Sequence, residues 1–321
     1  MLRRTFYSIV TCAFIAAFTI AACDSGNDVV PPTTPIMASE WVDAANWDTA
    51  TTVEVSMVET SATEMSFSPN NLSFEAGRPY ILRITNAASN SSKHYFSPEG
   101  TSFYQAIATR KVQTAEAEYK APYFDAVELK LGGTLEIYFV PVIAGTYDII
   151  CTITNHTSYG MTGQAIITGG EGNQLNLEVA ADFNTALLTD ERRSGGHAVW
   201  TNATETTVGM AEASDSYAFV PPDLALTAGV GYRLLLDNPS DNAKKHYYTA
   251  ADFYQTVVLR KADDDNAEIK VPYFKAVELL IGGSTTLFIV PTVAGTYDVL
   301  CTIPGHAELG MTGTITVGAS P

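Results

Sequence analysis

The sequence repeats itself over most of its length, and this duplication limits the folds open to the chain. The short segments FYQ, PYF and AGTYD occur at residues 103–105, 122–124 and 144–148, and each returns 150 positions later. From residue 103 to residue 168 the offset holds without a gap. Solenoid repeats are much shorter and cannot fold alone, so a period this long predicts a tandem pair of independent domains. We expect them at residues 51–169 and 201–318, joined by a connection at residues 170–200.

Each copy is predicted to be an all-β domain. Residues 52–57, 135–140 and 163–167 are rich in β-branched and aromatic side chains, and several of these runs alternate apolar with polar residues. Gly132-Gly133, Pro141 and Gly145 separate the runs at turn positions. Short strands with this spacing favour a β-sandwich. Residues 102–119 have few turn residues, so we expect a helical excursion within each sandwich.

The N-terminus has the pattern of an export signal. Arg3 and Arg4 precede an apolar run that ends in Ile20-Ala21-Ala22-Cys23. The run is too short for a comfortable membrane span and predicts a signal peptide over residues 1–22. Its last four residues resemble the lipobox of bacterial lipoproteins, which implies a lipid on Cys23 and a protein anchored on the periplasmic side of a bacterial membrane; an ordinary cleaved signal is the alternative. Residues 23–50 contain three prolines in a polar stretch and are expected to form a flexible tether.

The charge balance excludes one class of partner. The chain has 18 Lys and Arg residues against 35 Asp and Glu residues, a formal net charge of -17. A phosphate backbone would be repelled, so nucleic acid is not expected to bind. The same acidic excess favours transient docking to a basic protein, with association rates that fall as salt rises.

A Cys-x4-His-x4-Met pattern follows a predicted strand in each half. It comprises Cys151, His156 and Met161 in the first half and Cys301, His306 and Met311 in the second. An upstream histidine after a lysine, His94 in one copy and His246 in the other, supplies a second imidazole. Two imidazoles and a thiolate with a weak axial thioether are the ligands of a type 1 copper site. The sequence therefore predicts one copper ion in each half.

These residues resemble the cupredoxins, the blue copper family that includes plastocyanin, azurin and rusticyanin. The resemblance covers both halves and implies a tandem pair of Greek-key β-sandwich domains with two type 1 copper sites. By this resemblance His94, Cys151, His156 and Met161 bind one ion. His246, Cys301, His306 and Met311 bind the other. Thr154-Asn155 stands where the second copy has Pro304-Gly305, which predicts a looser first loop.

Two other uses of the cysteines have to be weighed. In an oxidising compartment Cys151 and Cys301 could form a disulfide, although each is matched to a histidine of its own half. A structural zinc site would be closed by four Cys or His ligands, and the thioether of a methionine is a poor substitute for any of them. The matched positions of four of the five histidines favour copper over both alternatives.

The resemblance implies a one-electron carrier that exchanges electrons with a cytochrome c or a terminal oxidase or reductase. Multicopper oxidases and copper nitrite reductases are built from the same domains but need further imidazoles. Only His197, in the connection and expected to be solvated, is left over, so the sequence predicts that the protein is not an enzyme. Copper storage and handling is the alternative function, and a binding module with one degenerate site is a third.

Overall fold

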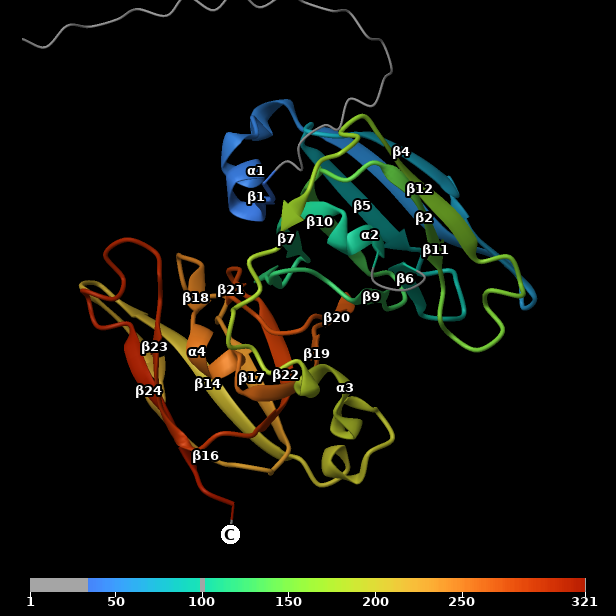
Figure 1. The fold of residues 1–321 in the computed structure, drawn as a ribbon. Helices are drawn as coiled ribbons and strands as arrows, with labels where there is room; N and C mark the ends of the chain where they lie inside the picture. Colours follow the sequence, from blue (N-terminus) through green and yellow to red (C-terminus); the bar gives the residue numbers. More distant parts are fainter. Residues whose placement is uncertain (1–33, 99–101, 321) are drawn as a thin grey trace, which may run out of the picture. The chain divides into compact units, whose positions relative to one another are not determined.

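The computed structural model describes residues 34–98 and 102–320. The predicted signal peptide and Cys23 lie outside the described residues. Each half is a sandwich of β-strands, which confirms the all-β prediction (Figure 1). Within the described ranges, every helix is too short or too polar to cross a membrane.

The described residues of the first half form eleven strands in two sheets. Across one sheet the order is β8-β7-β10-β5-β2-β3, and across the other it is β9-β6-β11-β12-β4. β2 and β5 are parallel, as are β4 and β12, and the other pairs are antiparallel. The bounds are β2 (Thr51–Ser61), β3 (Glu64–Ser68), β4 (Asn71–Glu75), β5 (Tyr80–Asn86), β6 (His94–Pro98), β7 (Ile107–Gln113), β8 (Ala117–Lys120), β9 (Ala126–Leu129), β10 (Thr134–Pro141), β11 (Gly145–Ile150) and β12 (Thr162–Thr168).

The second half repeats this arrangement. One sheet has the order β15-β14-β17-β22-β19-β20, and β16, β24 and β23 form the other together with β18 and β21. The bounds are β14 (Thr204–Ala213), β15 (Ser216–Val220), β16 (Asp223–Thr227), β17 (Tyr232–Asp237), β18 (His246–Tyr248), β19 (Val257–Asp263), β20 (Ala267–Lys270), β21 (Ala276–Leu279), β22 (Ser284–Pro291), β23 (Gly295–Leu300) and β24 (Thr312–Gly318).

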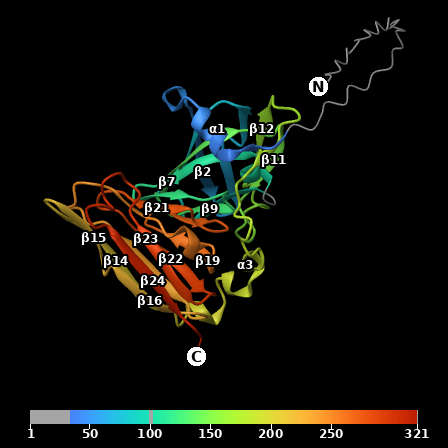
Figure 2. The same cartoon turned by 60° about the vertical axis from the view of Figure 1, so that its left-hand side comes forward.

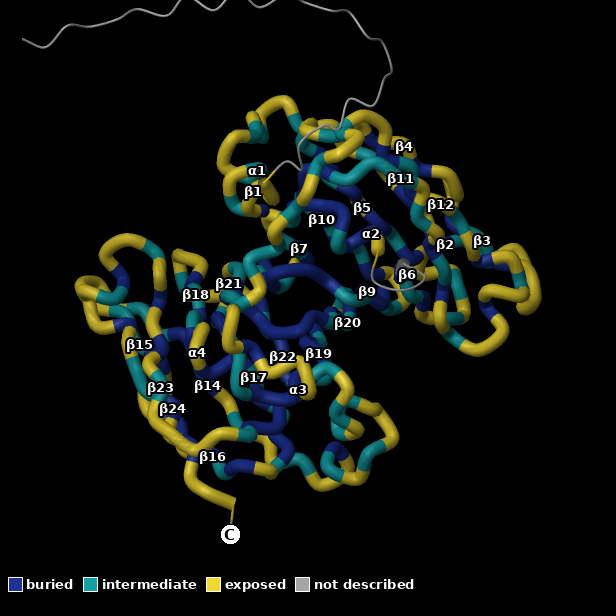
Figure 3. The backbone as a smooth tube through the Cα atoms, viewed as in Figure 1, coloured by how far each residue is buried: buried dark blue, intermediate teal, exposed yellow. Residues whose placement is uncertain are grey.

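Alternating side chains build the core of each sandwich. Along β5 the residues Tyr80, Leu82 and Ile84 are buried while their neighbours are more exposed, as expected for a strand with one face inward. Figure 3 shows the buried segments gathered inside each half and along the strands between the halves. A rigid, close-packed sandwich of this kind can hold loop residues at its end in fixed positions.

The two halves are not independent, in contrast to the sequence-based expectation. β8 pairs with β21 and β9 pairs with β20, so both sheets of the first half continue into the second (Figure 2). Lys270 donates a hydrogen bond of 2.7 Å to the hydroxyl of Tyr95, and Lys120 makes the matching 2.6 Å bond to Tyr247. The sheets join because an unpaired edge strand exposes backbone donors and acceptors. Each half covers such edges of the other.

The predicted short helical excursion is present in both halves. α2 (Ser102–Gln105) and its counterpart α4 (Ala251–Tyr254) have four residues each, and the chain then returns to strands. β7 follows at once because Ile107, Ala108 and Val112 are buried and pair with β10. The helix therefore ends after about one turn, where strand pairing begins.

Part of the predicted tether is ordered. It holds β1 (Ile36–Met37), α1 (Ala38–Ala44) and the short helix η1 (Trp47–Thr49). α1 packs Ala38, Trp41 and Val42 against β7 and β10, and Glu178 accepts two hydrogen bonds from Ser39 at 2.8 and 2.9 Å. These apolar side chains explain why the segment folds onto the first half. The connection holds β13 (Leu175–Asn176), α3 (Ala186–Thr189), η2 (Glu191–Arg193) and η3 (Ala198–Trp200).

Candidate metal centres

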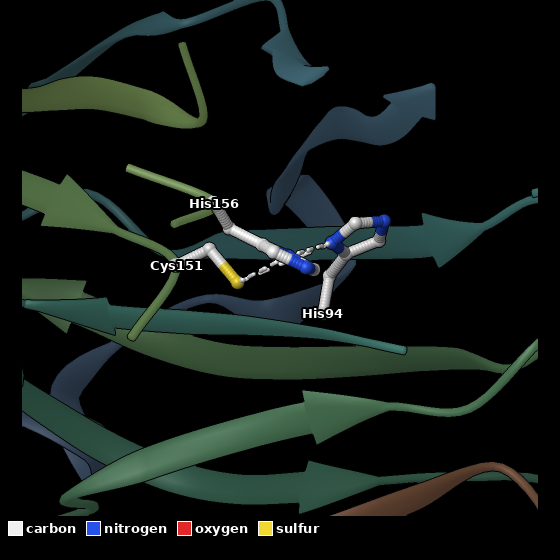
Figure 4. Close-up of side chains that lie close together, drawn as sticks. All are labelled: His94, Cys151 and His156. Carbon is white, nitrogen blue, oxygen red and sulfur yellow. Dashed lines mark hydrogen bonds between the residues drawn. The ribbon is translucent and has the colours of Figure 1, made fainter. Parts of the chain in front are cut away.

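Three elements bring the predicted ligands of the first half together. His94 is the first residue of β6, Cys151 directly follows β11, and His156 lies in the turns between β11 and β12. The turns are closed by main-chain hydrogen bonds from His156 to Ile153 (3.0 Å) and from Met161 to His156 (3.0 Å). Figure 4 shows the side chains of His94, Cys151 and His156 pointing toward one another.

The donor atoms of this group lie 3 to 4 Å apart. The Nδ1 atoms of His94 and His156 are separated by 3.1 Å, and Sγ of Cys151 lies 3.4 Å from Nδ1 of His156 and 4.0 Å from Nδ1 of His94. Ligands that bind one ion at roughly 2.0 to 2.3 Å are separated by such distances. The three donors can therefore reach a common ion.

The second half holds the same group. The Nδ1 atoms of His246 and His306 are 3.1 Å apart, and Sγ of Cys301 lies 3.4 Å from Nδ1 of His306. In each group the donor atoms all lie within 4.8 Å of one another. Both cysteines are free, so the alternative of a disulfide between Cys151 and Cys301 does not hold.

The predicted thioether ligands are tied to these groups through the backbone. Met161 and Met311 are fully buried. The amide of Cys151 donates to the carbonyl of Met161 at 3.1 Å, and the amide of Cys301 donates to that of Met311 at 3.0 Å. That the two methionines bind a metal ion stays a prediction.

A carboxylate behind each upstream histidine was missed by the sequence reasoning. Nε2 of His94 donates a 2.9 Å hydrogen bond to Glu59, and Nε2 of His246 donates one of the same length to Glu212. Because Nε2 carries the proton in this bond, Nδ1 is left as the metal-binding atom. Glu59 and Glu212 stand at matched places in the two copies, and that match is the signal that could have revealed them.

The carboxylate of Glu59 is itself held in place. It accepts hydrogen bonds from the amides of Ser91 (2.8 Å) and Ser92 (3.0 Å) and from the hydroxyl of Ser91 (2.6 Å). Burial alone would raise the pKa of Glu59, but these bonds and the nearby His94 lower it to about 2. Asn86 supports the same loop, since its side-chain amide donates to the carbonyls of Ser92 and Leu129 at 3.0 and 3.1 Å.

The electrostatics keep the metal-free groups neutral. Burial lowers the pKa of His94, His156, His246 and His306, which favours the unprotonated imidazoles that bind metals. Burial raises the pKa of Cys151, and amide hydrogen bonds from Ile153 and Tyr95 offset this only in part. The Tyr95 amide lies 3.3 Å from Sγ, and the Tyr247 amide lies at the same distance from Sγ of Cys301.

His197 is not part of either group. Its Nδ1 accepts a 3.1 Å hydrogen bond from the amide of Val199 and caps the short helix η3. Its side chain is 31% exposed. It therefore has a local structural role in the connection.

The donor set fits copper. Two imidazole nitrogens and one sulfur, buried together and matched in both halves, are donors that suit copper. The hydrogen bonds from Nε2 to Glu59 and Glu212 already orient the imidazoles, and the sulfurs accept amide hydrogen bonds that suit a thiolate.

A comparison with protein families agrees with this chemistry. Residues 206–318 match the family model described as copper binding proteins, plastocyanin/azurin family. Among solved structures, the chain is similar to auracyanin B, with 22% identity over 36% of this chain and 88% of that one and a TM-score of 0.26. A multicopper oxidase matches with 12% identity over 86% of this chain and 92% of that one and a TM-score of 0.29. A copper nitrite reductase from Nitrosomonas europaea matches with 12% identity over 84% of this chain and 94% of that one and a TM-score of 0.27. A comparison with curated proteins found no match.

The prediction that the protein is not an enzyme is wrong. The similar structures include multicopper oxidases and copper nitrite reductases, which are enzymes. The histidine count behind the prediction holds only where no second chain contributes further imidazoles.

Copper binding follows from the family match and the two ligand groups together. The matched residues 206–318 contain His246, Cys301, His306 and Met311, and the first half repeats this ligand group. Residues 206–318 therefore belong to the copper-binding plastocyanin/azurin family.

Proposed function

We propose that each half binds one type 1 copper ion and that the protein carries electrons one at a time. The ligands are His94, Cys151, His156 and Met161 in the first half and His246, Cys301, His306 and Met311 in the second. Bound copper would supply a one-electron redox couple. The observation that carries the proposal is the same buried His2Cys group in both halves, with matching distances between the donor atoms.

The chain's own contribution is a cage that holds its shape. Glu59 and Glu212 hold the imidazoles of His94 and His246 in place. Main-chain hydrogen bonds within the loop between β11 and β12 fix the relative positions of its cysteine, histidine and methionine. Ligands that are held in position in this way need little rearrangement when the charge of the bound ion changes, which favours fast electron exchange.

The edges of His156 and His306 are the proposed points of electron entry and exit. His156 is 7% exposed and His306 is 5% exposed, whereas His94 and His246 are fully buried. The acidic surface favours a basic redox partner such as a cytochrome c, and a terminal oxidase or reductase is a further partner class. We also propose that a lipid on Cys23 holds the protein on the periplasmic side of a bacterial membrane.

Metal analysis and visible spectroscopy test the copper sites. The purified protein should bind two equivalents of copper and be intensely blue when oxidised. Cys151→Ser and Cys301→Ser should each remove one equivalent and about half of the charge-transfer band. One equivalent in the unmodified protein would contradict a site in each half.

Electron transfer is tested by stopped-flow mixing of the reduced protein with an oxidised basic cytochrome c. We expect fast oxidation that slows as the salt concentration rises. Slow oxidation together with rapid loss of copper to a chelator would instead support copper storage. The anchor is tested with Cys23→Ala, which should move the protein from the membrane fraction to the soluble fraction.

A further inference from the structure

The two metal centres differ at one matched strand position. In the first half Met65 stands opposite Glu59 in the pairing of β2 with β3, and in the second half Tyr217 stands opposite Glu212 in the pairing of β14 with β15. Through its backbone, each residue contacts the loop that carries cysteine, histidine and methionine, which we call the ligand loop (residues 151–161 and 301–311). The Met65 amide donates to Tyr159 at 2.9 Å, and the Tyr217 amide donates to Leu309 at 3.0 Å.

The side chain at this position contacts a ligand in the second half. The ring of Tyr217 stacks on the imidazole of His306, with centroids 4.2 Å apart and an interplanar angle of 20°. It also lies 5.6 Å from the ring of His246. Met65 has no ring to offer and carries a flexible thioether chain instead. An aromatic stack restricts the ring it covers, so Tyr217 holds His306 in its ligand position.

The backbone of the ligand loop is also more restrained in the second half than in the first. Asn155 adopts a left-handed backbone conformation with φ of 71°, and the corresponding Gly305 adopts φ of 88°. A side chain at such an angle adds strain that glycine avoids. Pro304, at the place of Thr154, limits the conformations of an opened loop. The backbone conformation therefore favours the closed loop more strongly in the second half than in the first.

The rest of the two centres matches closely. The separation of the Nδ1 atoms is 3.1 Å in both, the distance from sulfur to the loop histidine is 3.4 Å in both, and the hydrogen bond to the carboxylate is 2.9 Å in both. The loop histidines have nearly equal exposure, 7% for His156 and 5% for His306. The stack and the loop backbone distinguish the second centre. The first loop has two hydrogen bonds of its own, from the Thr157 hydroxyl to the Cys151 carbonyl (2.9 Å) and from the Ser158 hydroxyl to the Asn155 carbonyl (2.7 Å), but neither touches an imidazole.

We propose that the two sites differ in how readily they release copper, the first site being labile and the second closed, with Tyr217 as the main positioning residue. The inference rests on the proposed function, since it requires copper in both halves. An ion leaves when the loop that carries cysteine, histidine and methionine opens, and loops with a weaker closed state open more often. We expect release from the first site to be about tenfold faster, the size of effect that an aromatic stack and a more favourable loop backbone supply together.

The experiment follows loss of Cu(I) from the loaded full-length chain to an excess of bathocuproine disulfonate. Copper content is measured first, and two equivalents are expected. The release trace should then show two phases of equal amplitude. Cys151→Ser should remove the fast phase and Cys301→Ser the slow one, which assigns each phase to its half.

Reciprocal substitutions test the role of Tyr217. Tyr217→Met should accelerate the slow phase several-fold and leave the fast phase unchanged, whereas Tyr217→Phe keeps the ring and should keep the slow rate. Met65→Tyr and Asn155→Gly should each slow the fast phase. A general loss of folding would change both phases, so an effect on one phase alone marks local positioning.

The outcomes separate this inference from the proposed function. Two equivalents released at equal rates, or faster from the second site, would overturn the inference and leave the copper sites in place. An unchanged slow phase in Tyr217→Met would remove Tyr217 from the explanation. A chain that binds a single equivalent would overturn both the inference and the proposed pair of sites.

Discussion

The carbonyl oxygen of Asn266 occupies the space into which a Cβ atom on Gly133 would project. Gly133 belongs to the first half and Asn266 to the second. The same carbonyl accepts a 2.9 Å hydrogen bond from the amide of Lys130. Gly283 has the matching relationship with the carbonyl of Glu116. The glycine pairs that punctuate the sequence are therefore contact points between the halves as well as turns.

Gly133→Ala should weaken the association of the two halves. The added methyl group meets backbone atoms that cannot move aside, and overpacking of this kind costs about 1 to 3 kcal/mol of unfolding free energy. Urea denaturation monitored by circular dichroism measures the change. Gly196→Ala is the control, because a Cβ atom there meets no heavy atom within 4 Å, and its effect should stay within about 0.5 kcal/mol. Equal stability of the two variants would contradict a close contact at Gly133.

Glu59→Ala should lower the copper affinity of the first site alone. Without the carboxylate, His94 loses the hydrogen bond that holds its ring and places the proton on Nε2. Loss of such a partner typically costs 10- to 100-fold in metal affinity, as an order-of-magnitude guide. Competition titration with a Cu(I) chelator measures it. Glu59→Gln retains an acceptor and should lose less, and Glu212→Ala should produce the same loss at the second site only.

The ligand loop could be predicted from the sequence because its geometry is local. Cys151, His156 and Met161 lie within eleven residues, and the exact repeat of their spacing at Cys301, His306 and Met311 marks them as a group. The upstream His94 was assigned as the second imidazole that the ligand set lacked, and by its match to His246. The structure brings both histidines next to the cysteines of their own halves.

The parts that could not be predicted depend on strand pairing. Glu59 contacts His94 only because the loop after β5 lies against β2, and a single sequence does not give that pairing. The junction of the halves depends on which sheet edges are left unpaired. The sequence therefore did not indicate that β8 of the first half pairs with β21 of the second. The ordered α1 was missed because its few apolar residues follow a proline-rich stretch that is typical of a tether.

Copper binding should release about one proton per site near neutral pH. Burial raises the pKa of Cys151 and Cys301 above the ordinary value of 9.0, so both thiols are protonated in the metal-free protein at pH 7. The thiolate is the ligand, and its proton must leave. A pH indicator in weakly buffered solution, titrated with Cu(I), should report about two protons per chain. Cys151→Ser should reduce this to about one, and release of no protons would show that the thiols do not bind the ion.

The buried ligand histidines should make the metal-free protein less stable as the pH falls below 6.5. Burial lowers the pKa of the four ligand histidines below 6.5, although Glu59 and Glu212 oppose this at His94 and His246. Between the folded and unfolded pKa values the unfolded chain binds more protons, so the free energy of unfolding decreases as the pH decreases.

The slope of that dependence can be assigned to the ligand groups. Each imidazole that stays neutral in the fold contributes at most about 1.4 kcal/mol per pH unit below pH 6.5. His156→Asn should therefore give a shallower dependence than the unmodified protein in urea denaturation at a series of pH values. Glu59, with its pKa lowered to about 2 from 4.5, adds to the loss only below pH 4.5 and does not affect this range. Burial raises the pKa of Glu128 and Glu278, which acts in the opposite direction, so the difference between the two slopes is the test. Equal slopes in His156→Asn and the unmodified protein would contradict the burial of a neutral His156 in the metal-free fold.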